Sequence, residues 1–282
     1  MATTTTPPTG AGSTPPERKP GVAPIRPRNS SGPLIVRFYR SAVGKKWVMG
    51  ITGVILMGFV FAHLVGNLKL FLSKEEINLY GEALRNMPGN LLPRTVLLWG
   101  IRIVLILAFV FHIHSAAGLT IINRRARPKG SQYQSKRDYV AADYASRTMR
   151  FTGIIVLLFL IFHLMDLTWG NANSQFLRGD PYNNLVYSLQ RPGAAIVYAI
   201  GSIALGIHLY HGSWSLFQSL GLTNPRYNSL RRRFAQVFAG VMLLGNLTFP
   251  VAVQLHLVTL QCPHTKPPTA ACPSSSSSGT KS

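Results

Sequence analysis

The sequence predicts an all-α fold, a polytopic membrane helix bundle with five transmembrane helices. The chain has 282 residues, of which 47% are hydrophobic and only 13% charged. Soluble domains carry about 25% charged residues, so the charge content here is roughly half the usual value. The apolar residues also gather into five long segments, and about 20 apolar residues suffice to cross a bilayer. The segments are Trp47–Leu72, Thr95–Ile122, Phe151–Trp169, Ala194–Leu220 and Phe234–Leu260.

The two ends of the chain differ from the central part, residues 34–260, which we expect to form the membrane domain. Residues 1–33 are rich in Thr, Pro, Gly and Ser and contain no apolar stretch of the signal-peptide type, which predicts a disordered cytoplasmic tail. Residues 261–282 form a flexible outer tail that contains Cys262 and Cys272. A disulfide or free thiols are the main expectation, with a metal site that includes His264 as the weaker alternative, because the potential ligands lack close pairing.

The basic residues predict the orientation of the segments. The formal net charge is +21, and 20 of the 29 Lys and Arg lie in the N-terminal part and in the loops after the second and fourth segments. The remaining connections and the C-terminal tail hold only 7. This asymmetry follows the positive-inside rule, with the N-terminus cytoplasmic and the C-terminus outside. The excess charge therefore needs no nucleic-acid partner.

Four of the five apolar segments carry a histidine well inside the hydrophobic stretch. These residues are His63, His112, His163 and His208. An ionisable side chain inside a membrane is costly and usually faces a site within the bundle. Neutral imidazole is also a standard axial ligand of haem iron. We therefore predict two haem-binding pairs; for any one histidine alone, a hydrogen bond to a nearby backbone carbonyl is the alternative.

Depth along the helices sorts the four histidines into pairs. Counted from the outer ends of their segments, at about Ser73, Pro93, Asn171 and Pro192, His63 and His163 lie 10 and 8 residues deep. On the same scale His112 and His208 lie 19 and 16 residues deep. The pairs His63/His163 and His112/His208 are therefore separated by about 13 Å along the membrane normal. Two haems at that spacing would relay electrons across the membrane.

Two further histidines compete with the inner pair. His114 lies two residues after His112, about 200° further round the helix, so both cannot face one iron. His211 is three residues after His208 and lies near the same face. Five other residues are candidates for binding quinone or a haem propionate, or for contact with a partner. They are Ser41, Lys46, Trp47, Arg102 and Asp166, of which the last two could also pair with each other.

Several short motifs occur in a fixed order around these histidines. They are Ser41–Lys46, Ile51–Gly53, His63–Leu68, Asn123–Pro128, Arg150–Gly153, Phe162–Asp166 and His208–Gly221. Together they resemble the single-subunit, five-helix, diheme cytochrome b anchor of bacterial succinate dehydrogenase and fumarate reductase. The resemblance covers about residues 33–260. It favours His112 over His114, because the Asn-Arg-Arg run begins eleven residues after His112, and it favours His208, four residues before Gly212.

The resemblance implies a complex of the bacterial cytoplasmic membrane with a flavoprotein subunit and an iron–sulfur subunit on the cytoplasmic side. It implies two b-type haems, held by His63, His112, His163 and His208, and a quinone, menaquinone in particular, as the electron partner. Two other functions remain open from the residues alone. One is a haem-free structural anchor with a quinone pocket, and the other is a proton-coupled transporter that uses the membrane histidines.

Overall fold

The computed structural model describes residues 32–87, 89, 93–125, 144–222 and 224–261, and no strand occurs among them. Five helices are long and apolar enough to cross a membrane, which confirms the predicted fold class. The spans are Ala42–Phe71, Val96–Arg125, Met149–Trp169, Pro192–Ser219 and Pro225–Gln254. The predicted tails, residues 1–33 and 261–282 with both cysteines, lie almost wholly outside the described residues.

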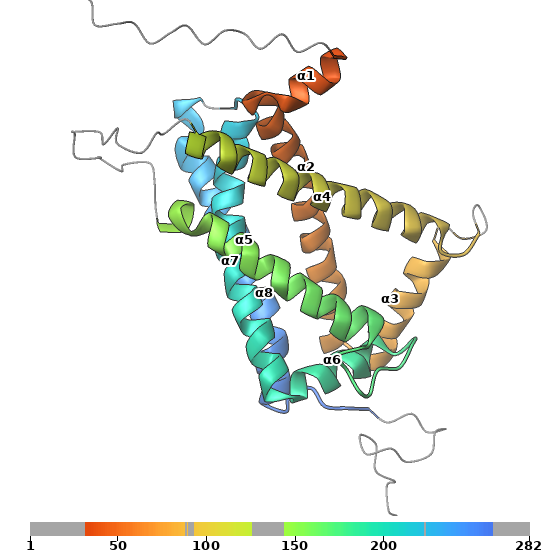
Figure 1. The fold of residues 1–282 in the computed structure, drawn as a ribbon. Helices are drawn as coiled ribbons and strands as arrows, with labels where there is room; N and C mark the ends of the chain where they lie inside the picture. The colour runs from red at the N-terminus through yellow and green to blue at the C-terminus, as the bar shows by residue number, and fades with distance from the viewer. Residues whose placement is uncertain (1–31, 88, 90–92, 126–143, 223, 262–282) are drawn as a thin grey trace, which may run out of the picture.

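The spans are built mainly from α2 (Ala42–Asn67), α4 (Val96–Arg125), α5 (Tyr144–Leu164), α7 (Pro192–Ser219) and α8 (Asn228–Gln254). Ser41 caps α2 by accepting a hydrogen bond from the Gly44 amide at 2.9 Å. Pro192 opens α7 at a position where its missing N–H costs nothing. Successive spans alternate in direction (Figure 1). One end of the bundle therefore carries α1 (Leu34–Arg40) and the α7–α8 connection, and we call it the α1 face.

The opposite end, the α3–α6 face, carries two short helices that apolar segment length did not predict. They are α3 (Lys74–Asn86) and α6 (Pro181–Gln190). Asn78 on α3 donates a hydrogen bond to the Asp180 carboxylate, which caps α6. The chain beyond α8 closes over them, since the Tyr182 hydroxyl donates to the Thr259 carbonyl at 3.1 Å. These helices tie the α2–α4 and α5–α7 connections together, as Figure 1 shows.

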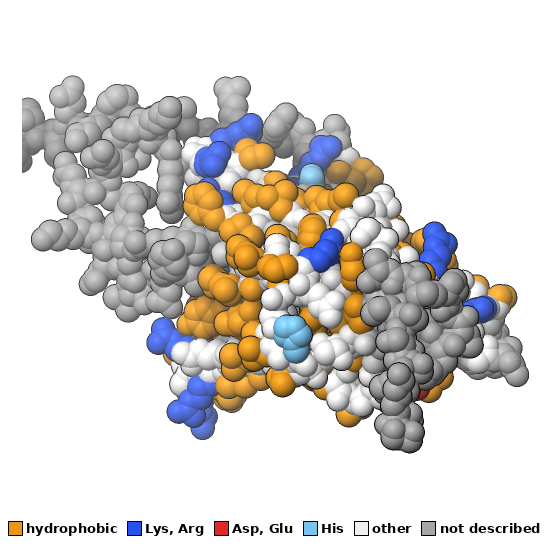
Figure 2. All heavy atoms as spheres, turned by 90° about the horizontal axis from the view of Figure 1, so that it is seen from below, with side chains coloured by type: hydrophobic (Ala, Val, Ile, Leu, Met, Phe, Trp, Pro, Cys, Tyr) orange, Lys and Arg blue, Asp and Glu red, His pale blue; other side chains and the backbone are white. Residues whose placement is uncertain are grey.

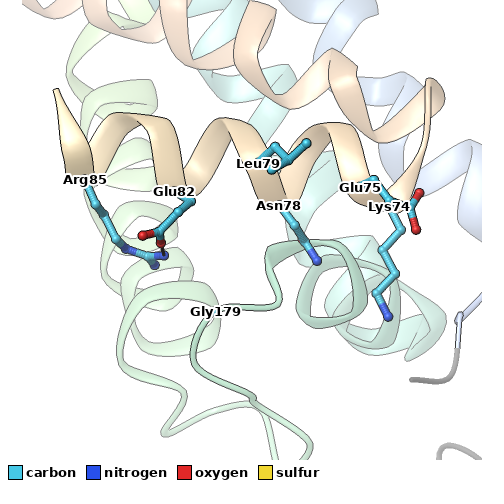
Figure 3. A pocket seen from close by; sticks show the side chains of 7 residues that line it. All are labelled: Lys74, Glu75, Asn78, Leu79, Glu82, Arg85 and Gly179. Carbon is cyan, nitrogen blue, oxygen red and sulfur yellow. Dashed lines mark hydrogen bonds and ion pairs between the residues drawn. The ribbon is translucent and has the colours of Figure 1, made fainter. Parts of the chain in front are cut away.

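An open hollow of about 430 Å³ lies beside α3 on this face (Figure 3). Its lining consists of Lys74, Glu75, Asn78, Leu79, Glu82, Arg85 and Gly179. Glu82 is paired with Arg85, and Asn78 is bonded to Asp180. Glu82, Arg85 and Asn78 are thus already engaged with other side chains, and none of the membrane histidines lines the hollow.

The fifth span differs from its predicted bounds. It begins at Pro225, nine residues before Phe234, because the arginine-rich turn Arg231–Arg233 is already helical. Arg231 is buried and donates to the carbonyls of Leu222 and Asn224, which closes the α7–α8 connection. The helix ends at Gln254, and His256 then adopts a left-handed backbone with φ 59°. A search for apolar residues alone misses a helix whose first turns are basic.

The interior of the bundle lies around α7 and α8, with α2 packed against them. Leu64, Leu209 and Met242 are among its buried side chains. The outer sides of α4 and α5 expose large apolar residues such as Ile103, Leu107 and Leu158, as expected for lipid-facing helices. Figure 2 shows hydrophobic side chains over much of the visible surface, with Lys and Arg side chains mostly towards its edges.

Candidate functional site

The structure brings the four membrane histidines together in the two pairs that depth predicted. The rings of His63 on α2 and His163 on α5 have centroids 5.9 Å apart, with their planes at 89°. The rings of His112 on α4 and His208 on α7 have centroids 6.5 Å apart, at 66°. Each pair therefore joins the α2–α4 hairpin to the α5–α7 hairpin. We call His63/His163 the outer pair and His112/His208 the inner pair.

The ring spacings suit ligation of one metal by each pair. Two imidazoles that bind one iron from opposite sides, with metal–nitrogen distances of about 2.0 Å, have ring centres about 6.3 Å apart. The observed 5.9 Å and 6.5 Å fall on either side of that value. Among the described residues, no group of three or more His, Cys, Asp or Glu is arranged to hold a metal ion. Each pair supplies two imidazoles, the number of protein ligands that a haem with two histidine ligands takes.

The inner pair is oriented by two threonines. Thr52 Oγ1 lies 3.3 Å from His112 Nδ1, and Thr152 Oγ1 lies 3.4 Å from His208 Nδ1. Each hydroxyl donates its own proton to a backbone carbonyl, at 2.7 Å for Thr52 and 3.0 Å for Thr152. It can therefore only accept from the imidazole, which assigns the proton to Nδ1 and leaves Nε2 with its lone pair free.

Glycine positions complete the surroundings of the inner pair. Gly53 and Gly153 lie alongside the rings, where an added Cβ would stand 3.6 Å and 3.5 Å from the Cε1 atoms. These distances are ordinary van der Waals contacts, so each glycine position brings its helix close to the neighbouring imidazole.

Ser115, one helical turn beyond His112, is fully buried, and its hydroxyl has no hydrogen-bond partner in the described part of the chain. A buried hydroxyl without a partner is costly and calls for an explanation. It lies on the α1-face side of the inner pair, where a polar edge of a bound cofactor would satisfy it. This orphaned atom is a further sign that the residues around the inner pair fit a haem.

The outer pair has a different environment. The hydroxyl of Tyr198 lies 3.3 Å from His163 Nδ1 and donates to Asp166 Oδ2 at 2.9 Å. Because the hydroxyl donates to the carboxylate, it accepts from Nδ1–H, which again leaves Nε2 free. In the described part of the chain His63 has ring contacts, to Phe59 and His163, but no hydrogen-bond partner. The two histidines of the outer pair thus differ in their hydrogen bonding.

Asp166 does not pair with Arg102, as one of the sequence-based alternatives had it. Its partner is Arg191, whose Nη2 lies 2.6 Å from Asp166 Oδ1. Arg102 is exposed on α4, with its guanidinium 5.0 Å from the centre of the Trp99 ring. The expectation failed because Arg191 lies in the connection before α7, which the sequence gives no reason to fold back over Asp166.

An internal repeat underlies the two pairs. Seven residues of α2 recur on α5 with numbers higher by 100, and His208 on α7 follows His112 on α4 by 96. The recurring residues are Met49, Thr52, Gly53, Ile55, Phe59, His63 and Leu64, matched by Met149, Thr152, Gly153, Ile155, Phe159, His163 and Leu164. The structure gives the matched residues matched contacts, including a Phe–His ring contact in each half. Aligning the chain with itself would have revealed the threonines, which the search for membrane histidines missed.

His114 has another partner and does not face the inner pair. Its ring stacks on that of Tyr39, with centroids 5.6 Å apart, and its Nδ1 is hydrogen-bonded to the Tyr39 hydroxyl. Lys45 lies over the same Tyr39 ring at 4.6 Å. These contacts dock α1 onto α4. The ring that faces His112 is that of His208.

The remaining candidates lie at the α1 face and are not gathered into one site. Ser41 serves as the cap of α2, and its hydroxyl donates to the Phe38 carbonyl at 2.6 Å. Lys46 and Trp47 are exposed at the start of α2. Arg127, predicted to lie in a basic cytoplasmic loop, falls outside the described residues. A role for any of them in binding quinone, propionate or a partner stays a prediction.

Comparison with known proteins points to one family. The model of the succinate dehydrogenase/fumarate reductase transmembrane subunit family matches residues 120–248. The match includes α5, α7 and most of α8, and with them His163 and His208. Comparison with curated proteins and with solved structures gave no match. Residues 120–248 of this multi-pass membrane protein are thus similar to the transmembrane-subunit family of succinate dehydrogenase and fumarate reductase.

Proposed function

We propose that this chain anchors a succinate:quinone oxidoreductase in the membrane and carries electrons through two b-type haems. The observation that carries the proposal is the pairing of four membrane histidines at ring spacings of 5.9 Å and 6.5 Å. His63 and His163 would hold the outer haem, and His112 and His208 the inner haem. A haem supplies one-electron transfer, and two histidine ligands leave its iron no free position for oxygen.

The chain's own residues hold and orient the ligands. Thr52 and Thr152 fix the inner imidazoles by accepting from Nδ1–H, and Tyr198 does so for His163. Such hydrogen bonds set ring orientation and raise the basicity of the ligand. The apolar helices around them exclude water, which keeps the charge of the iron in a low-dielectric environment. The site is therefore built for transfer of electrons and not for chemistry on a substrate carbon.

The similarity of residues 120–248 to the transmembrane-subunit family supports an assembly with further subunits. A flavoprotein and an iron–sulfur subunit are expected on the cytoplasmic side of a bacterial inner membrane. The positive-inside rule assigns that side to the α1 face, with Arg37, Arg40, Lys46 and Arg231–Arg233 at or near it. Electrons would then pass between the iron–sulfur subunit and a membrane quinone, menaquinone in particular. Ser41, Lys46, Trp47 and Arg102 remain candidates for quinone or propionate contacts.

A reduced-minus-oxidised optical spectrum of the purified complex tests the proposal. We expect two b-type components in the native complex. His63→Ala and His163→Ala should each remove the same component, and His112→Ala and His208→Ala the other. His256→Asn is the matched control, because His256 lies outside the bundle and asparagine tolerates its left-handed backbone. Native complex without a b-type band would leave the haem-free anchor as the function.

A further inference from the structure

A carboxylate buried in the membrane distinguishes the outer pair from the inner pair. Asp166 follows His163 by three residues, in the π-helical turn η3 (Met165–Trp169) that ends the third span, and none of its surface is exposed. Burial of a charge inside a membrane is expensive and is usually retained for a function. Single π-helical turns are also frequent at functional sites.

The carboxylate is held from both sides. Arg191 reaches Oδ1 at 2.6 Å and is itself fixed by a 2.7 Å hydrogen bond to the Ala172 carbonyl. On the other side, the hydroxyls of Ser188 and Tyr198 both donate to Oδ2. A buried ion pair with its remaining lone pairs satisfied keeps one geometry. The network therefore presents the Tyr198 hydroxyl to its neighbour in a fixed position.

That neighbour is His163. The Tyr198 hydroxyl lies 3.3 Å from Nδ1, and the ring of Tyr198 also contacts the imidazole edge to face, with centroids 5.8 Å apart. Hydrogen bonds in a chain polarise one another, so the negative charge of Asp166 strengthens the acceptor that Tyr198 offers to His163. The hydrogen bonds of the inner pair differ, because the Thr52 and Thr152 hydroxyls donate to neutral backbone carbonyls and not to a carboxylate.

We propose that Asp166 and Tyr198 are positioning residues that lower the reduction potential of the outer haem by making His163 an electron-rich ligand. This inference rests on the proposed function. A ligand whose Nδ1–H donates to a polarised acceptor gives more electron density to the iron and so favours the oxidised state. Arg191 balances the carboxylate charge, so the effect is transmitted mainly through the hydrogen-bond chain. The inner haem, whose ligands His112 and His208 contact Thr52 and Thr152, lacks this effect.

Redox potentiometry of the complex, followed optically, tests this with Tyr198→Phe and Asp166→Asn. Tyr198→Phe keeps the ring contacts and removes only the hydroxyl. We expect both variants to retain two haems and to raise the potential of one component. The expected size is at least a tenfold change in its electron equilibrium, about 59 mV for a one-electron couple. The component that His163→Ala removes should be the one that shifts, with an altered low-spin ferric signal in electron paramagnetic resonance.

Asp180→Asn is the matched control. The Asp180 carboxylate lies at the same end of the bundle, but it accepts hydrogen bonds from Asn78 and Asn183 and not from a residue that contacts a membrane histidine. It should leave both potentials unchanged. Two retained haems with unchanged potentials in Tyr198→Phe would overturn the inference and leave the proposed function standing. Retention of both components in His163→Ala would instead overturn the proposed function. If Asp166→Asn does not assemble, Tyr198→Phe alone decides.

Discussion

The hydroxyl of Thr152 lies 3.4 Å from His208 Nδ1. The equivalent hydroxyl in the first half of the chain, that of Thr52, lies 3.3 Å from Nδ1 of His112, the histidine that faces His208. The two contacts belong to different hairpins but converge on one pair of imidazoles. Matched contacts on both ligands indicate that the inner pair is held symmetrically, in contrast to the outer pair.

Replacement of either threonine should affect the same haem. In Thr52→Val or Thr152→Val the imidazole loses an acceptor for Nδ1–H, which is worth roughly 0.5–1.5 kcal/mol. Because about 1.4 kcal/mol corresponds to 59 mV for one electron, we expect the inner-haem potential to rise by some tens of millivolts. Redox potentiometry measures this. Thr120→Val is the control, since the Thr120 hydroxyl donates to the Ala116 carbonyl on its own helix. If Thr52→Val and Thr152→Val shifted the potentials of two different haem components, the assignment of both threonines to the inner pair would be wrong.

The choice of His112 over His114 can be tested directly. His112→Ala should abolish the inner-haem component, because the ring that faces His208 is lost. His114→Ala should keep both components, because its partner is Tyr39 on α1. Optical spectra of the two variants, compared with Tyr39→Phe, measure this. Loss of a haem in His114→Ala, with both retained in His112→Ala, would reverse the choice.

Arg191 should matter more for stability than other arginines of the α3–α6 face. Arg191→Gln leaves the fully buried carboxylate of Asp166 without its counter-ion. Breaking a buried pair costs about 3–5 kcal/mol, and we expect roughly 2–4 because 35% of the Arg191 side chain is exposed. Thermal unfolding of the detergent-solubilised complex measures the loss. Exposed Arg178→Gln is the control, and equal melting temperatures for the two would show that the pair contributes nothing.

Gly201 allows α5 and α7 to approach closely beside the outer pair. A Cβ at this position would overlap the ring of Phe159, which itself contacts His163. Gly201→Ala should therefore destabilise the protein by about 1–3 kcal/mol and perturb the outer-haem spectrum. Gly240→Ala on α8 is the control, because nothing lies within 4 Å of its added Cβ. Melting curves and spectra that match between the two variants would refute the close-packing argument.

The orientation can be tested with single cysteines on the two faces. Leu79→Cys on α3 and Leu222→Cys beyond α7 both replace exposed residues, 65% and 60% accessible. In a background with Cys262 and Cys272 replaced by Ser, a membrane-impermeant thiol reagent should label the first position in intact cells. The second position should react only in inverted vesicles. The opposite pattern would reverse the topology inferred from the basic residues.

Much of the fold can be predicted from the sequence, because backbone polar groups inside a bilayer must form hydrogen bonds within the protein. Five apolar segments of sufficient length have few alternatives to spanning helices, and the depths of His63 and His163 indicated which side chains meet. Apolar segment length does not reveal α3 and α6, because they are short, polar and stabilised by contacts distant in sequence, such as that from Tyr182 to Thr259. The contacts of Arg191 and Tyr198 with Asp166 could not be predicted from the sequence for the same reason. Their roles arise from a polar network that forms only once the connection before α7 folds back.

The crossing of histidine pairs between hairpins has a consequence for assembly. On the proposed ligation, the α2–α4 hairpin would supply one ligand to each iron and never two to the same one, and so would the α5–α7 hairpin. Neither half of the polypeptide could then retain the cofactor before the other has entered the bilayer. The two haems would then hold the two halves of the bundle together, and they could bind only after the fourth span is in the membrane.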